Sequence, residues 1–190
     1  MLSDKIWVTR KARIYAEKRL LKKAVLSQIL MIVYSALLVF FSISNLISEN
    51  KSFDMLSIFG SIAVLLASVL LASQRYTERS MAMRNCYIQL DVLCTKVIQF
   101  EKNNDTDMLL NCESEYSSIL ANIENHTDYD YLCLRYSLRN NSNTTLPPFR
   151  WLDHVKLIWA KFWRGFVTVI CFVLPFLILK AWKVYENYIG

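Results

Sequence analysis

The chain has 190 residues, of which 54% are hydrophobic and 20% charged, and its formal net charge is +6. Only three glycines occur, so neither a Walker-type phosphate loop nor a dinucleotide-binding glycine fingerprint can be assembled. The composition therefore argues against a nucleotide-dependent enzyme and favours a membrane protein in which apolar segments alternate with polar ones.

The first 23 residues are strongly basic. They hold eight Lys and Arg residues against Asp4 and Glu17, and this excess equals the net charge of the whole chain. We predict a basic amphipathic helix over residues 1–23 that contacts anionic lipid headgroups, because it directly precedes an apolar segment. That position argues against the other common role of basic patches, direct nucleic-acid binding. The predicted headgroup contacts are Arg10, Lys11, Lys18, Arg19, Lys22 and Lys23.

Two segments without any charged side chain follow, at residues 24–48 and 55–74. About 20 apolar residues span a bilayer as a helix. A helix in a soluble protein keeps a polar face, which these segments lack. Residues 24–74 are therefore predicted to form a transmembrane hairpin.

The distribution of basic residues predicts the orientation of this hairpin. Lys51 is the single basic residue between the two segments, whereas Arg75, Arg79 and Arg84 follow the second one closely. Because Lys and Arg concentrate on the cytoplasmic side, we expect the N-terminus and residues 75–164 in the cytoplasm.

Small residues recur on one face of the second segment. In lipid such a stripe usually packs against another helix. Alternatively, it lines a water-filled path, which two or three helices cannot enclose, so that a pore would need several subunits. The stripe consists of Ser57, Ser61, Ser68 and Ala72.

Residues 75–140 are predicted to form a cytoplasmic helical module. Its first helix is expected to continue from the second span to about Phe100, since residues along it repeat every three or four positions. This seam either packs within the chain or joins subunits, and spacing leaves both open. The candidate oligomerisation seam is Tyr76, Met83, Tyr87, Leu90 and Val97.

Further helices are expected over about 106–122 and 129–138, with a break at 103–105. Between Asn103 and Leu134 there are seven acidic residues and no Lys or Arg. Such a patch is a solvated face, a docking surface for the basic N-terminal helix, or a concentrator of cations near a pore mouth. A polar, Pro-containing linker is predicted over 141–149.

The C-terminal part is predicted to hold an interfacial helix and a third span. Over residues 150–164, aromatic and aliphatic residues share one helical face, as in helices that lie in the membrane interface. Residues 165–182 are predicted to form a third transmembrane segment, although Pro175 interrupts a short apolar run. A re-entrant or interfacial segment is the alternative.

No motif for catalysis or for a cofactor is present. The five cysteines form no C-x-x-C pair, and His126 and His154 stand apart from one another. A membrane-embedded enzyme acting on lipid would need a pair such as Asp153 and His154, but adjacent helical residues point in different directions. We therefore predict no enzymatic activity and no cofactor or metal.

The residues after the second span resemble the SLATT domain family, a two-transmembrane module with a juxtamembrane Tyr and Arg before a helix carrying an aromatic residue and leucines. The resemblance covers roughly residues 5 to 125 and leaves the third apolar segment outside. The matching positions are Arg75, Tyr76, Arg79, Met83, Tyr87, Leu90 and Leu93.

The resemblance implies an all-α, multi-pass protein of the bacterial inner membrane. Proteins of this kind are effectors of nucleotide-linked or reverse-transcriptase-linked anti-phage systems, thought to oligomerise into pores that end growth of the infected cell. The resemblance implies no catalytic residues. The implied partners are further copies of the chain, the bilayer, and a nucleotide second messenger or a sensor protein encoded nearby. A non-conducting membrane scaffold that recruits a soluble partner is the alternative function.

Overall fold

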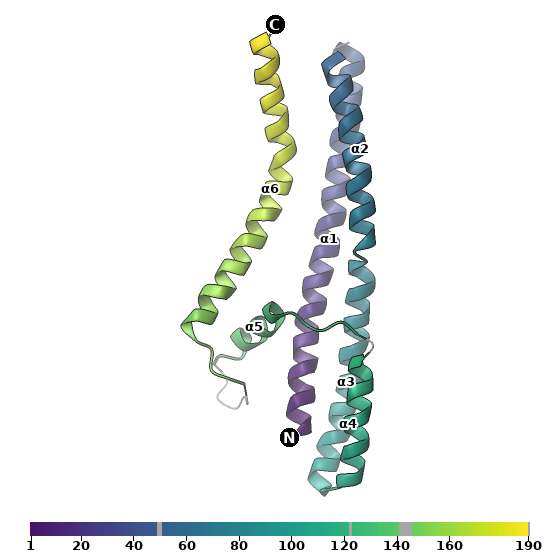
Figure 1. Ribbon diagram of the computed structural model, residues 1–190, viewed down its shortest axis with the longest axis vertical. Coiled ribbons are helices and arrows are strands. Elements are labelled where there is room, and N and C mark those ends of the chain that lie inside the picture. The colour runs from purple at the N-terminus through teal and green to yellow at the C-terminus, as the bar shows by residue number, and fades with distance from the viewer. Residues whose placement is uncertain (49–50, 122, 141–145, 190) are drawn as a thin grey trace. The chain divides into compact units, whose positions relative to one another are not determined.

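A computed structural model shows the chain as a set of helices (Figure 1) and describes residues 1–48, 51–121, 123–140 and 146–189. No strand occurs in these ranges, and three helices are long and apolar enough to cross a membrane. The prediction of an all-α membrane protein is confirmed. The helices are α1 (Leu2–Ser48), α2 (Lys51–Ser73), α3 (Tyr76–Asn103), α4 (Thr106–Ala121), α5 (Asp128–Ser137) and α6 (Trp151–Ile189).

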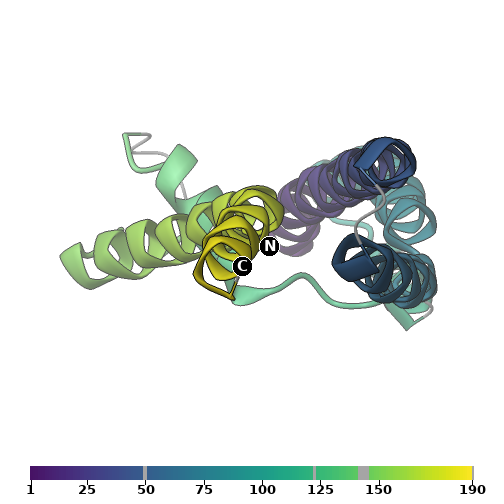
Figure 2. The same cartoon turned by 90° about the horizontal axis from the view of Figure 1, so that it is seen from above.

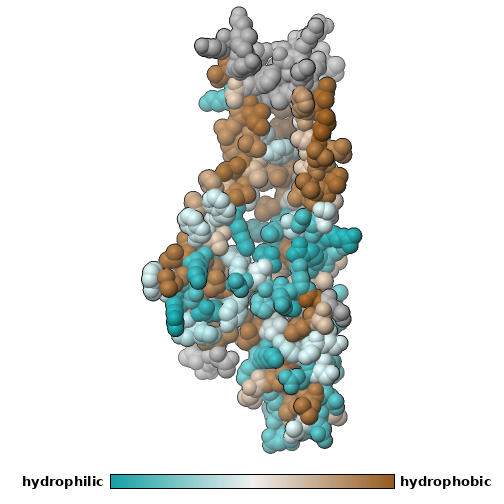
Figure 3. Space-filling model, viewed as in Figure 1, coloured by the Kyte–Doolittle hydropathy of each residue, from teal (hydrophilic) through white to brown (hydrophobic). Residues whose placement is uncertain are grey.

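The chain divides into two compact units. The helical unit comprises residues 1–23 and 76–160, and the membrane unit comprises residues 24–75 and 161–190. Helices α1 and α6 each contribute to both units without a break in the helix. Hydrophobic side chains cover most of the visible surface of the membrane unit, while hydrophilic ones are frequent on the helical unit (Figure 3).

The membrane unit contains the predicted hairpin of α1 and α2, whose connected ends lie next to each other in Figure 2. Its large apolar side chains point outward, for example Phe59 at 68% exposure and Leu70 at 66%. Soluble monomers rarely expose an apolar surface of this extent, whereas a bilayer solvates it. Residues 49–50 at the tip of the hairpin lie outside the described residues.

The prediction that one helix continues from the second span to Phe100 is wrong. Helix α2 ends at Ser73, and α3 begins at Tyr76. The backbone N–H groups of Gln74 and Arg75 donate to the carbonyls of Leu71 and Ala72 at 3.3 and 3.2 Å, which tightens the last turn. Arg75 then adopts a left-handed conformation, with φ at 46°, and this ends the helix.

The helical unit is built around α3, which packs against α4 and the first part of α1. Its core joins Ile6 of α1 to Leu90 and Leu93 of α3 and to Cys112 and Tyr116 of α4. A second cluster joins Ala16 and Leu20 to Met83.

The turn between α3 and α4 lies where the sequence predicts a break. Asn104 is left-handed with φ at 52°, and the N–H of Asp105 donates to the Phe100 carbonyl at 3.2 Å, as in a Schellman C-cap. The Asp105 carboxylate then accepts the Met108 N–H at 3.2 Å and caps α4. Asp105 therefore serves both the end of one helix and the start of the next.

Helix α6 is one helix where the sequence suggested an interfacial helix followed by a separate span. Neither Gly165 nor Pro175 ends it. An added Cβ at Gly165 would meet nothing within 4 Å, so this glycine reflects no close packing. Of the predicted linker 141–149, residues 141–145 lie outside the described residues.

Candidate functional site

The serine stripe of α2 does not form one packed face in the membrane unit. The Ser57 hydroxyl lies 3.1 Å from that of Ser42 on α1. The Ser61 and Ser68 hydroxyls instead donate to carbonyls one turn earlier in α2, at 2.8 and 2.7 Å. Ser61 and Ala72 are exposed and Ser68 is half-buried. The stripe therefore faces mostly away from the other helices of its own unit, and its functional role stays a prediction.

Helix α2 turns a different face inward, which the sequence reading missed. A Cβ added to Gly60 would lie 2.7 Å from Cδ2 of Leu38, so α1 and α2 approach closely there. Gly60, Ala63 and Ala67 line the space between the helices. Small residues three and seven positions apart are a packing signal in lipid, and this spacing makes the face a second candidate beside the serine stripe.

Pro175 leaves one backbone carbonyl of α6 without its helical hydrogen bond, and Tyr34 supplies a donor for it. Proline has no N–H, so the carbonyl of Cys171 four residues earlier receives no helical hydrogen bond. The Tyr34 hydroxyl of α1 donates to this carbonyl at 2.7 Å. In a membrane an unpaired carbonyl is costly, so this bond explains how the proline is accommodated and links α1 to α6.

The seam of α3 is largely buried within the chain. Met83, Leu90 and Val97 are fully buried, whereas Tyr76 and Tyr87 are half-buried. The covering helices are α1 and α4. Intramolecular packing thus accounts for the period of this helix. Self-association through the same residues stays a prediction, and it would require α1 or α4 to move away from them.

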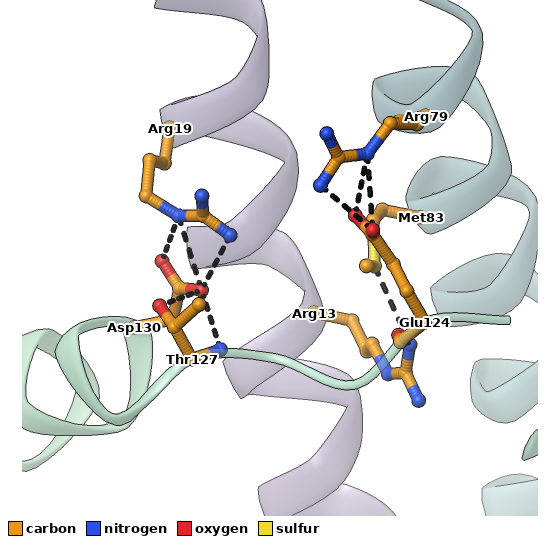
Figure 4. Close-up of polar contacts among 7 residues, drawn as sticks. All are labelled: Arg13, Arg19, Arg79, Met83, Glu124, Thr127 and Asp130. Carbon is orange, nitrogen blue, oxygen red and sulfur yellow. Dashed lines mark hydrogen bonds and ion pairs between the residues drawn. The ribbon is translucent and has the colours of Figure 1, made fainter. Parts of the chain in front are cut away.

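Three arginines hold the connector between α4 and α5, residues 123–127, and the start of α5 (Figure 4). Arg13 and Arg19 come from α1, and Arg79 comes from α3. Arg13 donates to the backbone carbonyl of Glu124, while Arg79 binds the Glu124 carboxylate at 2.7 Å. One connector residue is therefore held from two helices.

Arg13 is an unusual member of this group because it is fully buried without a carboxylate among its described partners. Besides the Glu124 carbonyl, its guanidinium contacts Met83 Sδ at 3.4 Å and Asn125 Oδ1 at 3.5 Å, and its Nε has no partner. Burial of a cation beside neutral groups costs free energy, so Arg13 is held by the fold around it.

Arg19 and Asp130 form a buried ion pair. Arg19 Nε lies 2.9 Å from Asp130 Oδ1, and Arg19 Nη2 lies 3.1 Å from Oδ2. The side chain of Asp130 is 0% exposed and that of Arg19 10%. Asp130 Oδ2 also accepts the N–H and the hydroxyl of Thr127, at 3.0 and 2.8 Å, and so caps α5. This carboxylate ties the start of α5 to α1.

The basic residues assigned to lipid headgroups are divided by the fold. Arg10 pairs with Asp91 of α3, and Arg19 pairs with Asp130. Lys18, Lys22 and Lys23 are exposed, whereas Lys11 is half-buried with its ammonium 5.7 Å from the Trp7 ring. Headgroup contact stays a prediction for all six. Through Asp130, the acidic segment docks onto the basic N-terminal helix, which is one of the three roles considered for this segment.

The first turns of α6 expose the predicted interfacial face. Trp151 is 72% exposed, in contrast to Leu157, which is buried at 3% exposure. The Asp153 carboxylate accepts from Arg135 at 2.9 Å and from the Arg150 N–H at 3.1 Å. The His154 ring instead contacts Phe149, with centroids 4.6 Å apart. Asp153 and His154 thus contact different groups, and these contacts do not join them as a catalytic pair. The exposed apolar face consists of Trp151, Val155, Ile158, Trp159 and Phe162.

His126, in the connector, predicts a pH dependence of stability. Burial lowers its pKa below the usual 6.5, the nearby Arg13 charge lowers it further, and Asp130 and Asp128 oppose this. The unfolded chain therefore binds a proton more readily than the folded one as the pH falls below 6.5. Stability contributed by neutral His126 is complete above that pH and declines below it.

We expect the unfolding temperature of the full chain in detergent, followed by tryptophan fluorescence, to drop between pH values above and below 6.5. His126→Asn should flatten this drop, because asparagine does not titrate in this range. A drop of the same size in the His126→Asn protein would show that another group causes it.

A chain whose described residues form helices and no strand, with three helices of membrane length, is an α-helical membrane protein. The family model described as "SMODS and SLOG-associating 2TM effector domain family 5" matches residues 1–181, and the chain belongs to this family. No curated protein and no solved structure matches the chain. The match extends through most of α6, so the estimate of 5 to 125 was too short and the third apolar segment belongs to the family region.

Proposed function

We propose that this protein is the membrane effector of a bacterial anti-phage defence system, which oligomerises in the inner membrane when triggered and forms a pore or disrupts the bilayer. Growth arrest or death of the infected cell would follow. The family match supports the effector role. The observation that carries the proposal is that α1 belongs to both units as one helix.

The connector supplies a means of control in this proposal. Arg13 and Arg19 lie on the part of α1 that precedes its apolar segment, and both hold residues 124–130. A nucleotide second messenger or a sensor protein that displaced this segment would free both arginines and change how α1 packs. Because α1 continues into the membrane unit, its apolar segment would experience the change. In this proposal the N-terminus and residues 75–164 face the cytoplasm.

The serine stripe beyond Ser57 is the proposed contact between subunits. Ser61, Ser68 and Ala72 bring small side chains to the outside of α2, where a helix of another copy can approach closely. Ser57 is excluded from this role because it contacts Ser42 within the chain. In the assembled state the stripe would either pack between subunits or line a path for ions.

The test is membrane potential, measured with a fluorescent dye in bacteria that express the chain at low and high levels. We expect depolarisation at high expression that is lost in the double variant Ser61→Leu/Ser68→Leu. The matched control is Ile62→Leu/Val69→Leu, which places two leucines on a neighbouring exposed part of α2. Both variants must reach the membrane in equal amounts.

Absence of depolarisation at every level would contradict a self-sufficient pore and favour a non-conducting scaffold. The scaffold is tested with the full chain as bait for soluble partners. A fragment of residues 75–149 would be a poor bait, since it lacks Ile6, Ala16 and Leu20, which complete the core against α3.

A further inference from the structure

The three helices of the membrane unit line a partly open cavity of about 420 Å³. Helix α1 contributes Leu38 to its wall, α2 contributes Gly60 and Ala67, and α6 contributes Leu174. The small residues of α2 create this space, because larger side chains there would fill the gap between the hairpin and α6. The volume lies within the range of about 300–1,000 Å³ that is usual for ligand pockets.

The chemistry of the wall selects an apolar occupant. Among the described residues that line the cavity, none carries a charged side chain. Its two hydroxyl groups already have partners within the protein, Tyr34 at the Cys171 carbonyl and Ser57 at Ser42. An apolar cavity without free polar groups does not hold ordered water. A polar or charged ligand would lose its hydration without gaining hydrogen bonds.

The size of the cavity distinguishes a hydrocarbon chain from a helix of a second copy. The lining residues run from Leu30 to Phe41 on α1 and from Ser57 to Leu71 on α2, a length of roughly 17–21 Å at 1.5 Å per residue. A volume of about 420 Å³ spread over that length is narrow, whereas a helix with its side chains is about 10 Å wide. A slender, flexible chain can follow the space between the helices.

We propose that this cavity binds one acyl chain of a bilayer phospholipid. The surroundings of the membrane unit are the source of the ligand, because its helices have the length and composition to lie in lipid. An empty cavity deprives the side chains around it of dispersion contacts, and an acyl chain restores them. The bound chain wedges between the α1–α2 hairpin and α6, next to the bond between Tyr34 and Cys171.

The experiment uses the purified full chain in detergent with phosphatidylglycerol that carries a diazirine in one acyl chain. After irradiation, labelled positions are mapped by peptide mass spectrometry at increasing lipid concentration. We expect saturable labelling around Leu38, Ala67 and Leu174. The variant Ala67→Phe fills the cavity and should reduce this labelling several-fold. The control Val69→Phe places the same side chain at an outward position that is 61% exposed, and it should label like the unmodified protein.

A second readout is the unfolding temperature. Added phosphatidylglycerol should raise it for the unmodified chain and for Val69→Phe by mass action, but not for Ala67→Phe. Labelling of the unmodified chain that does not saturate, or that favours outward positions such as Ile62, would overturn the proposal even if Ala67→Phe fails to fold. Equal labelling of folded Ala67→Phe and the unmodified protein would overturn it as well.

Discussion

Arg19→Ala is expected to destabilise the helical unit by about 3–5 kcal/mol, because removal of one partner from a buried ion pair leaves the other charge uncompensated. The remaining partner is Asp130, whose side chain is 0% exposed. Its two contacts with Thr127 keep it oriented toward the space that Arg19 vacates. We therefore expect α5 to detach from α1 before the core of α3 opens.

Thiol labelling in the full, detergent-solubilised chain measures this effect. Cys86, Cys94 and Cys112 are buried, so their reaction with a maleimide in increasing denaturant reports opening of the helical unit. Lys18→Ala, at the exposed neighbouring position, is the control and should leave the midpoint unchanged. The double variant Arg19→Ala/Asp130→Ala should lose less than the sum of the two single changes. A cost below about 1 kcal/mol for Arg19→Ala, typical of exposed pairs, would contradict the burial of this pair.

Leu90→Ala is expected to cost about 2–5 kcal/mol, since it leaves a cavity in the core where α1, α3 and α4 meet. The same thiol assay applies. Val92→Ala is the matched control: its side chain is 57% exposed, so its removal should change stability by no more than about 0.5 kcal/mol.

The Leu90→Ala result also distinguishes the two roles considered for the α3 seam, packing within the chain and contact between subunits. If the seam serves packing within the chain, loss of stability precedes any change in assembly. If it joins subunits, crosslinked oligomers should decrease in Leu90→Ala while Cys86 and Cys94 stay protected from the maleimide. Leu90→Asp would not separate these cases, because a carboxylate at a fully buried position unfolds the unit in either case.

The proposed acyl-chain site and the proposed subunit contact, both in the membrane unit, can be tested independently of these changes. The acyl-chain site depends on the inward face at Gly60 and Ala67, and the proposed subunit contact depends on the outward face at Ser61 and Ser68. A pore that persists when the cavity is filled would leave the proposed function intact and limit the lipid to a structural role.

Local patterns in the sequence predicted much of this architecture. The absence of charge over residues 24–48 and 55–74 predicted spans, since a bilayer tolerates few charged side chains. Helix α4 spans Thr106–Ala121 where 106–122 was expected, because Asp105 caps its start through a local contact. The break at Gln74 and Arg75 was missed, since arginine carries no local signal for a left-handed conformation.

The contacts of the candidate sites were harder to predict from the sequence. Arg19 was assigned to a headgroup-binding cluster and Arg13 was given no role, yet their partners Glu124 and Asp130 lie more than a hundred residues away in the chain. Arg13 lies on α1 together with Ala16 and Leu20, which are buried against α3. That Arg13 also points inward becomes evident only when the packing of α1 on α3 is known. The bond from Tyr34 to the Cys171 carbonyl likewise joins residues whose proximity no local pattern encodes.

By itself, the sequence determined the properties that depend on near neighbours along the chain: which segments are helical, which are apolar enough for a membrane, and the family to which they belong. Only the tertiary structure decided which face of each helix is used. It assigned the inner face of α2 to Gly60 and Ala67, and it paired basic residues of α1 with the acidic segment. The physical reason is that the spacing of apolar residues along a helix shows which face is buried, but not which helix packs against that face. The packing partner depends on contacts between helices that are distant in sequence.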